Sequence, residues 1–305
     1  MSVICRPYQH PEDYERVDEF LVRSYASMVR GPHRNWLEPR WEYMHYHPSI
    51  FDQQENLARC GIWLDAGTLI GAVHFEDRLG VIYIQLDPSY AELKCEMLEY
   101  AMEHLAGDFK VGRAVHVFLD EDDNEWHEIA RRLGYERMPE PRHAEIMTKL
   151  EAEQVPNRAS RLDGFEILGL DEDDDVRKVH RVMHRGFNHE GDPPEEELEG
   201  RRRKLSAPSL RKDLTVVARA PSGDFVSFCG MWFDSVNRIA YVEPVATDPD
   251  YRRRGLGTAV VLEAARRCVA EGATAAYVGS DQPFYRAMGF RPVYAHRIWR
   301  KQLGG

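Results

Sequence analysis

The feature that most constrains the fold is a strand-like run that leads through an arginine- and glycine-rich loop into a helix. It reads Tyr241-Val-Glu-Pro-Val-Ala-Thr-Asp-Pro-Asp-Tyr-Arg-Arg-Arg-Gly-Leu-Gly-Thr-Ala259. Gly255 and Gly257 allow the backbone to turn tightly and to come close to a ligand. The unpaired N–H groups of the helix that follows point at any anion bound there, and three consecutive arginines add positive charge. The pattern predicts a phosphate-binding loop.

Two common phosphate loops do not fit this stretch. A dinucleotide-binding loop needs G-x-G-x-x-G, but Val260 occupies the position of the third glycine. A P-loop needs Gly-Lys-Ser/Thr, which the stretch lacks. The pattern present is R-x-x-G-x-G, directly after an apolar strand. A second block, Phe284-Tyr-Arg-Ala-Met-Gly-Phe290, follows downstream.

Together the two blocks resemble the GNAT superfamily of N-acetyltransferases, sharply over Phe225 to Val293 and diffusely elsewhere. The resemblance implies acetyl-CoA as co-substrate, without a metal. It also implies an α/β (α+β) fold in which a mixed, mostly antiparallel central sheet is flanked by helices. A splayed V separates the strands around the pyrophosphate-loop helix. A solvated arginine run before an ordinary helix would explain Arg253 and Arg254, but not the glycines or the second block.

The resemblance places the coenzyme along the end of the strand and the loop after it. Pro244 interrupts a central strand, which is typical of a bulge or a splayed edge. In the family, the pantetheine arm pairs with the backbone freed there. The implied residues are Val245, Ala246 and Thr247 for pantetheine, and Arg252, Arg253, Arg254, Gly255, Leu256, Gly257 and Thr258 for the pyrophosphate.

Two side chains are candidates for proton transfer. An amine of pKa near ~10 must lose a proton to attack a thioester, and a thiolate of pKa roughly ~8.5 leaves more easily when protonated. We expect Glu243 to share one strand face with Tyr241 and Val245, where several relatives place a general base. Tyr285 matches the tyrosine that relatives use to protonate the thiolate. A structural role for Glu243 at the bulge, and simple packing for Tyr285, stay open.

The acceptor is poorly specified, because variable loops build that pocket. The loop after an early helix borders the acceptor in this family, which makes Phe187, Asn188 and His189 candidates, together with Trp232. The predicted reaction is direct transfer of acetyl to a primary amine of a small molecule. Acetylation of a protein or peptide amine, and a non-catalytic sensor or scaffold that binds coenzyme A, remain alternatives.

The chain of 305 residues is long enough for two domains, and its halves share one order of elements. We predict a GNAT-like domain over 1–150, a linker over 151–162 and a second domain over 163–305. Asp87-Pro88 corresponds to Asp248-Pro249, and Gly134-Tyr135 to Gly289-Phe290, with nearly the same separation along the chain. This order indicates an internal repeat. Two unrelated α/β domains are the alternative.

Individual elements follow from periodicity and turn residues. The predicted strands are Gly61–Asp65, Thr68–Glu76, Val81–Leu86 and Ala114–Leu119 in the first half, and Leu214–Arg219, Phe225–Phe233, Ile239–Thr247, Ala273–Gly279 and Val293–Trp299 in the second. The predicted helices include Glu125–Leu133, Gly255–Ala270 and a short one through Phe284 to Met288.

The first half departs from the family pattern at each tested position. Alignment on the prolines puts Ala91, Lys94 and Glu96 where Arg252, Gly255 and Gly257 stand. Alignment on Gly134 and Gly289 puts Ala130 in place of Tyr285. We therefore expect the first half to have lost coenzyme binding, as is known of one copy in other tandem members of the family.

Composition and charge exclude some classes of binding partner. A formal net charge of −11 opposes general binding to nucleic acid. The sequence contains no run of 18 apolar residues, the length that a membrane-spanning helix needs. The N-terminus lacks the apolar core of a signal peptide. The 5 cysteines are scattered, which predicts reduced thiols and a cytoplasmic location. The sequence does not indicate an oligomeric state.

Overall fold

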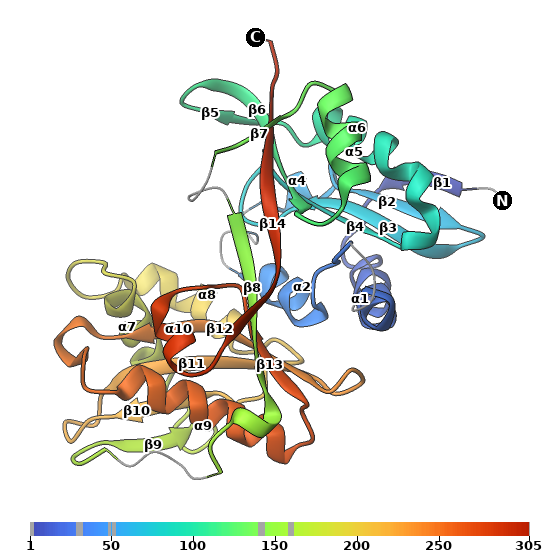
Figure 1. The fold of residues 1–305 in the computed structure, drawn as a ribbon. Coiled ribbons are helices and arrows are strands. Elements are labelled where there is room, and N and C mark those ends of the chain that lie inside the picture. Colours follow the sequence, from blue (N-terminus) through green and yellow to red (C-terminus); the bar gives the residue numbers. More distant parts are fainter. Residues whose placement is uncertain are drawn as a thin grey trace. The chain divides into compact units, whose positions relative to one another are not determined.

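The computed structural model describes residues 3–28, 33–47, 50, 53–139, 144–157 and 162–304. The chain forms two compact units, one of Met1–Ile146 with Tyr294–Gly305 and one of Met147–Val293. Each unit has a mostly antiparallel sheet with helices packed on it, as can be followed in Figure 1. The predicted α/β class is confirmed.

The first unit has its strands in the order β1-β2-β3-β4-β6-β14, with β5 on β6 and β7 on β14. Among these strands, only β4 and β6 pair in parallel. Its elements are β1 (Val3–Pro7), α1 (Tyr14–Met28), α2 (Glu38–His45), α4 (Gln54–Leu57), β2 (Gly61–Asp65), β3 (Thr68–Phe75), β4 (Val81–Leu86), η1 (Pro88–Leu93), α5 (Lys94–His104), β5 (Gly107–Phe109), β6 (Gly112–Asp120), α6 (Asn124–Arg132), β7 (Glu136–Arg137) and the greater part of β14 (Arg291–Gln302).

The second unit has the order β8-β13-β12-β11-β10-β9, and among these strands only β12 and β13 pair in parallel. Its elements are the greater part of β8 (Ala144–Glu151), η2 (Ala152–Gln154), β9 (Glu166–Gly169), α7 (Val176–Gly186), η3 (Glu195–Glu197), α8 (Leu198–Lys204), β10 (Val216–Arg219), β11 (Phe225–Asp234), β12 (Ile239–Thr247), η4 (Pro249–Tyr251), α9 (Leu256–Ala270), β13 (Ala275–Val278) and α10 (Pro283–Ala287).

The second unit has a core on each face of its sheet, because successive side chains of a strand point to opposite faces. On β10, Val216 and Ala218 pack with α9, whereas Val217 packs with α7. The predicted apolar spacing of α9 is confirmed, since Val260 and its neighbours at every fourth position are fully buried. The sheet is thus held rigidly between α7 and α9, the two helices that border the site described below.

In both units the two parallel strands pair at one end only. β12 pairs with β13 over Ile239–Tyr241 and not beyond. β4 pairs with β6 over Val81 and Ile82 only. The later residues of β12 and β4 therefore have a strand neighbour on one side, which is the splayed V that the family resemblance predicted.

The two predicted landmark pairs also correspond in geometry. Asp87 and Asp248 each cap a 3-10 helix by accepting a hydrogen bond from the backbone N–H two residues later, at 2.9 and 3.0 Å. Gly134 and Gly289 each follow a short helix with positive φ, of 79° and 107°. The repeated plan thus extends to details that a shared order of elements does not require.

The units differ from the predicted domains 1–150 and 163–305 at their ends. From Met147 onward, β8 belongs to the second unit and pairs with β13. From Tyr294 onward, the last strand belongs to the first unit and pairs with β6 and β7. Strand patterns reveal that a segment is extended, but its partner is chosen by packing. The two units therefore exchange their terminal strands.

The predicted linker 151–162 is only partly free of the core. Ala152 donates its N–H to the carbonyl of Thr274 at 3.0 Å, and Val155 is buried in the core of the second unit. Residues 158–161 lie outside the described residues. No helix in the described part of the chain is long and apolar enough to cross a membrane.

Candidate active site

A cavity of about 560 Å³ lies where β12 ends and α9 begins. Every predicted coenzyme residue except Arg254 lines it, and so does Tyr285. The full lining is Gly186, Val245, Ala246, Thr247, Tyr251, Arg252, Arg253, Gly255, Leu256, Gly257, Thr258, Gln282, Phe284 and Tyr285. Strand end, glycine loop and short helix α10 therefore meet at one hollow.

The loop at the start of α9 has the form of an anion site. Gly255 is the N-cap with φ of 81°, a left-handed conformation that favours glycine. Since a glycine has no side chain, it supplies no capping oxygen to the first N–H groups of α9. Those groups are left to bind an anion, which the positive end of the 15-residue helix would attract.

Gly257 leaves space that a larger residue would remove. A Cβ atom built on Gly257 would lie 3.2 Å from Thr247 Oγ1 and 3.2 Å from a ring carbon of Phe284. The helix backbone therefore sits directly against the end of β12 and against α10. A flexible, thin chain such as pantetheine, with its pyrophosphate on the helix start, suits this hollow.

The three arginines have different roles in the structure. Arg252 donates from Nε to the carbonyl of Thr247 at 3.1 Å and from Nη2 to the carbonyl of Gly186 at 2.8 Å. Arg253 has φ of 65°, and it lines the cavity. Arg254 lies over the ring of Tyr251 and donates to the carbonyl of Asp250, away from the cavity lining. Arg252 thus holds the conformation of the loop through these hydrogen bonds, in addition to supplying positive charge.

Glu243 lies at a bulge between β11 and β12. Val242 pairs with Met231 and Val245 with Cys229, so two residues of β12 stand opposite Gly230 alone. The extra residue shifts the alternation, which puts Val245 on the face of Val242. The predicted common face of Tyr241, Glu243 and Val245 is therefore wrong.

A hydrogen bond and a close approach of two backbones fix the bulge. The indole N–H of Trp232 donates to the carbonyl of Glu243 at 2.7 Å. A Cβ atom on Gly230 would lie 2.4 Å from the same carbonyl oxygen, so only glycine fits there. Glu243 is half-buried and is not part of the cavity lining.

Tyr285 is buried in α10, with 8% of its surface exposed, and it lines the cavity. Burial raises the pKa of its hydroxyl, and the charges of Cys229 and Glu243 raise that pKa further. The phenol therefore keeps its proton at neutral pH.

The predicted acceptor residues are not brought together. Phe187 caps the end of α7 with half of its surface exposed, Asn188 has φ of 65°, and the ring of His189 lies tilted against that of His184 at 5.0 Å. Trp232 has no exposed surface, so its ring cannot contact a substrate, and its prediction as a substrate residue is wrong. It acts on the site through the carbonyl of Glu243.

Four lining residues are absent from the prediction, namely Gly186, Tyr251, Gln282 and Phe284. Phe284 opens the second sequence block, which was a usable signal. Gly186 ends α7 with a Cβ position only 2.6 Å from the Cβ of Ala246, a constraint that sequence alone does not reveal. No cluster of metal-ligating side chains is found among the described residues.

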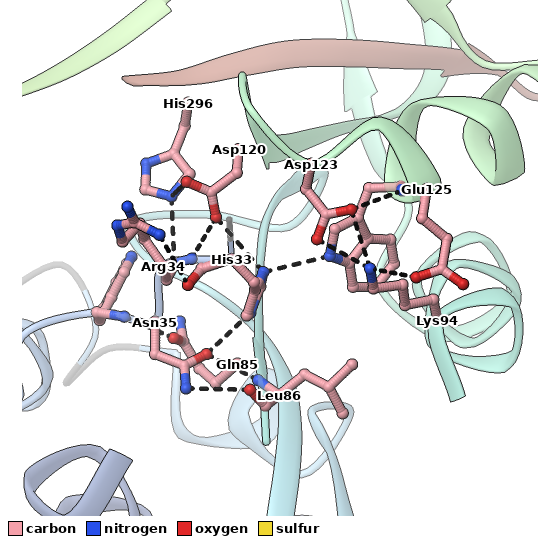
Figure 2. Close-up of polar contacts among 12 residues, drawn as sticks. His33, Arg34, Asn35, Gln85, Leu86, Lys94, Asp120, Asp123, Glu125 and His296 are labelled. Atoms are coloured by element: carbon pink, nitrogen blue, oxygen red, sulfur yellow. Dashed lines mark hydrogen bonds and ion pairs between the residues drawn. The ribbon is translucent and has the colours of Figure 1, made fainter. Parts of the chain in front are cut away.

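The first unit fills the equivalent region with its own side chains, as Figure 2 shows. Asn35 accepts from the N–H of Leu86 at 2.8 Å and donates to its carbonyl at 3.2 Å. Arg34 donates its N–H to Asp120 at the end of β6. The segment of Arg34 and Asn35 thus bonds both splayed strand ends, β4 and β6.

The helix start is also occupied in the first unit. Lys94, the first residue of α5, donates from Nζ to Asp123 at 2.8 Å and to Glu125 at 2.7 Å (Figure 2). Lys94 and Asp123 are both buried. Glu96, in the first turn of α5, accepts from the indole N–H of Trp63 at 2.7 Å. Side chains therefore stand where the second unit has its hollow.

Comparisons with known proteins agree with this geometry. The sequence model of the acetyltransferase (GNAT) family matches residues 176–290. A tandem GNAT protein from the clavulanic acid biosynthesis pathway is similar in structure over 100% of this chain and 99% of its own, with a TM-score of 0.66 and 12% identity. A GCN5-related N-acetyltransferase from Sphaerobacter thermophilus is similar over 99% and 97%, with a TM-score of 0.59 and 16% identity. No curated protein matches the sequence.

The fold and the cavity define the class as an acyl-coenzyme-A-dependent transferase. More narrowly, residues 176–290 of the second unit form an acetyltransferase domain of the GNAT family, so the chain contains an acetyltransferase. The likeness to a tandem GNAT protein extends the fold to both units. The GNAT family generally uses acetyl-CoA as the donor.

Proposed function

We propose that this enzyme transfers acetyl from acetyl-CoA to a primary amine of a small molecule by direct attack. The observation that carries the proposal is the single cavity that collects the glycine loop, the strand end and Tyr285. The amine nitrogen forms a bond to the thioester carbon, and the carbon–sulfur bond breaks. The products are an amide and free coenzyme A, and no covalent enzyme intermediate is needed.

The proposed proton transfers use two residues of the chain. Glu243 takes the proton that the amine loses, directly or through water. Tyr285 gives its proton to the departing thiolate, a role that suits a buried phenol with a raised pKa. Retention of both groups, with Tyr285 in the cavity lining, speaks against a sensor or scaffold without catalysis.

We propose that each chain binds one coenzyme, in the second unit. The ion pairs of Lys94 and the bonds of Asn35 to Leu86 support this stoichiometry, because a ligand would have to displace them. Leaving Asp123 buried without its lysine would cost about 3–5 kcal/mol. The first unit then serves as a structural partner.

Two structurally similar proteins support a small-molecule acceptor. One structurally similar tandem protein comes from the biosynthesis of a small molecule. A fungal protein region described as a glucosamine N-acetyltransferase is similar over 98% of this chain and 38% of its own, with a TM-score of 0.56 and 13% identity. Acetylation of a protein or peptide amine is the alternative. The free cysteines support the expected cytoplasmic location.

A screen of amines tests the proposal. Wild-type protein is mixed with acetyl-CoA and a panel of small amines and amine-bearing peptides, and release of coenzyme A is followed with a thiol reagent. We expect at least one small amine to accelerate release above the hydrolysis seen without acceptor. Acceleration by peptides alone would favour the alternative, and release by neither would contradict the proposal.

A further inference from the structure

A group of charged residues ties the end of α7 to the coenzyme loop. Arg185 donates from Nε to one oxygen of Asp248 and from Nη2 to the other at 3.0 Å. The same Nη2 donates to Asp250 at 2.6 Å. Because Arg252 also bonds the carbonyl of Gly186 at 2.8 Å, four hydrogen bonds join two short segments. We call these segments the α7 end (185–186) and the coenzyme loop (248–257).

The α7 end also leads into the predicted acceptor loop. Gly186 lines the cavity, and it lies so close to Ala246 that a Cβ atom could not be added. The next residues are Phe187, exposed at 52%, and Asn188. A change in the position of the coenzyme loop would therefore be transmitted directly to the start of the acceptor loop.

The negative charge of Asp248 would disfavour binding of an anionic ligand at the coenzyme loop. Asp248 is buried, with 1% of its side chain exposed, and it caps the turn that starts the coenzyme loop. A carboxylate so near a pyrophosphate site would repel the ligand unless a cation neutralised it. Arg185 is that cation, while Arg181 also acts on Asp248 and Asp192 acts on Arg185.

The first unit provides a comparison within the same molecule. Asp87 occupies the position of Asp248 and makes the same cap, with Ser89. Among the described residues, no ion pair involves Asp87. The cap is thus kept in both units, but the arginine is present only where the helix start is open to an anion.

We propose that Arg185 is a positioning residue for the coenzyme, which neutralises Asp248 and couples the acceptor loop to coenzyme binding. This inference rests on the proposed function of the second unit. Coenzyme binding and ordering of the loop after Gly186 then favour each other, as linked equilibria must.

The test measures binding of coenzyme A to full-length variants by calorimetry. We expect Arg185→Met to weaken binding about tenfold, within the range typical of coupled sites. Arg185→Lys, which keeps the charge, should lose less. Asp248→Asn keeps the capping oxygen, so the double variant R185M/D248N should regain much of the lost affinity. Arg177→Met is the matched control, because Arg177 lies on the same helix and pairs with exposed Glu195.

Two further readouts separate neutralisation from simple packing. The deficit of Arg185→Met should shrink in about 1 M salt, where charges are screened beyond roughly 3 Å. Hydrogen exchange of residues 187–192 should slow when coenzyme A binds to the wild type, and slow less in Arg185→Met.

Each failure has a distinct meaning. Wild-type protein that binds no coenzyme A would contradict the proposed function itself. Wild-type affinity in Arg185→Met, or no recovery in R185M/D248N, would overturn the inference and leave the function standing. If hydrogen exchange of residues 187–192 in the wild type does not change when coenzyme A binds, the proposed coupling is wrong. If Arg185→Met does not fold, R185K and the double variant decide between these outcomes.

Discussion

The roles proposed for single residues at the cavity depend on where protons reside. Tyr285 is buried and keeps its proton, because burial and nearby negative charge both raise its pKa. Glu243 supplies part of that negative charge from the bulge that Gly230 and Trp232 hold in place. The proposed acid and base therefore come from α10 and β12, and of the two only Tyr285 lines the cavity.

The first prediction concerns Tyr285→Phe, which removes the hydroxyl and keeps the ring. We expect kcat to fall about 10²–10⁴-fold, the usual contribution of a general acid. Affinity for coenzyme A should stay nearly unchanged, because the group acts in the transition state. Steady-state kinetics with thioesters of different thiol pKa are the measurement, and the loss should be smaller for more acidic thiols. A variant that keeps more than a third of kcat would contradict the role.

The second prediction concerns Glu243→Gln, which keeps the shape and removes the base. The rate should fall by a similar factor near neutral pH. It should then climb steadily with pH, because free amine becomes abundant without help from the enzyme. A pH profile of kcat/KM for wild type and variant measures this. Parallel profiles would show that Glu243 only supports the bulge.

At the scale of elements, the contacts around the bulge set the geometry of the site. The sequence predicted β12 as Ile239–Thr247, and the structure has the same bounds. Pro244 also indicated a bulge. What it did not reveal is the shift of alternation, because that depends on Gly230 of the neighbouring strand. Likewise nothing in the sequence separated Arg254 from Arg253, although of these two only Arg253 lines the cavity.

The third prediction is that Gly230→Ala damages both stability and activity. Its Cβ atom would stand 2.4 Å from the carbonyl of Glu243, so the backbone of one strand must move. We expect a loss of about 1–3 kcal/mol in the free energy of unfolding, as for overpacked cores, and a marked loss of kcat. Gly279→Ala is the control, since its Cβ would meet Tyr241 at an ordinary 3.5 Å. Denaturant unfolding that ranks the two variants equally would contradict this view of the bulge.

At the scale of the whole molecule, the sequence predicted two repeated α/β units but not the exchange of their terminal strands. The pattern of Val293–Trp299 indicates a strand, yet its partner β6 lies far away in sequence. From Lys94 and Glu96 the sequence predicts that the first half has lost coenzyme binding. That Asn35 bonds Leu86 on a splayed strand could not be predicted, because no periodicity marks an irregular segment.

The fourth prediction is that the first unit loses stability in mild acid. Burial lowers the pKa of His33 to about 4 and those of His45 and His74 to about 3. Their stabilising contribution is present above about pH 6.5 and is lost as the pH falls toward these values. Asp120 opposes them, because burial raises its pKa to about 6, so that its contribution is lost as pH rises through that value.

Near pH 5 the unfolded chain should therefore bind about two more protons than the folded unit, a slope of roughly 2.7 kcal/mol per pH unit. Tryptophan fluorescence during denaturant unfolding measures it, because Trp36, Trp41, Trp63, Trp126 and Trp299 are buried in this unit. His45→Gln should reduce the difference in bound protons between the unfolded and folded states by about one, and the slope in proportion. A stability that does not change between pH 7 and pH 5 would contradict the protonation states assigned here.

The central claim is that coenzyme binds at the start of α9, once per chain. Calorimetric titration with coenzyme A tests it most directly, on the wild type and on Gly257→Glu, which would put bulk and negative charge between Thr247 and Phe284. We predict saturation at one equivalent per chain for the wild type and loss of that binding in the variant. Saturation at two equivalents, or unchanged affinity in Gly257→Glu, would contradict the claim.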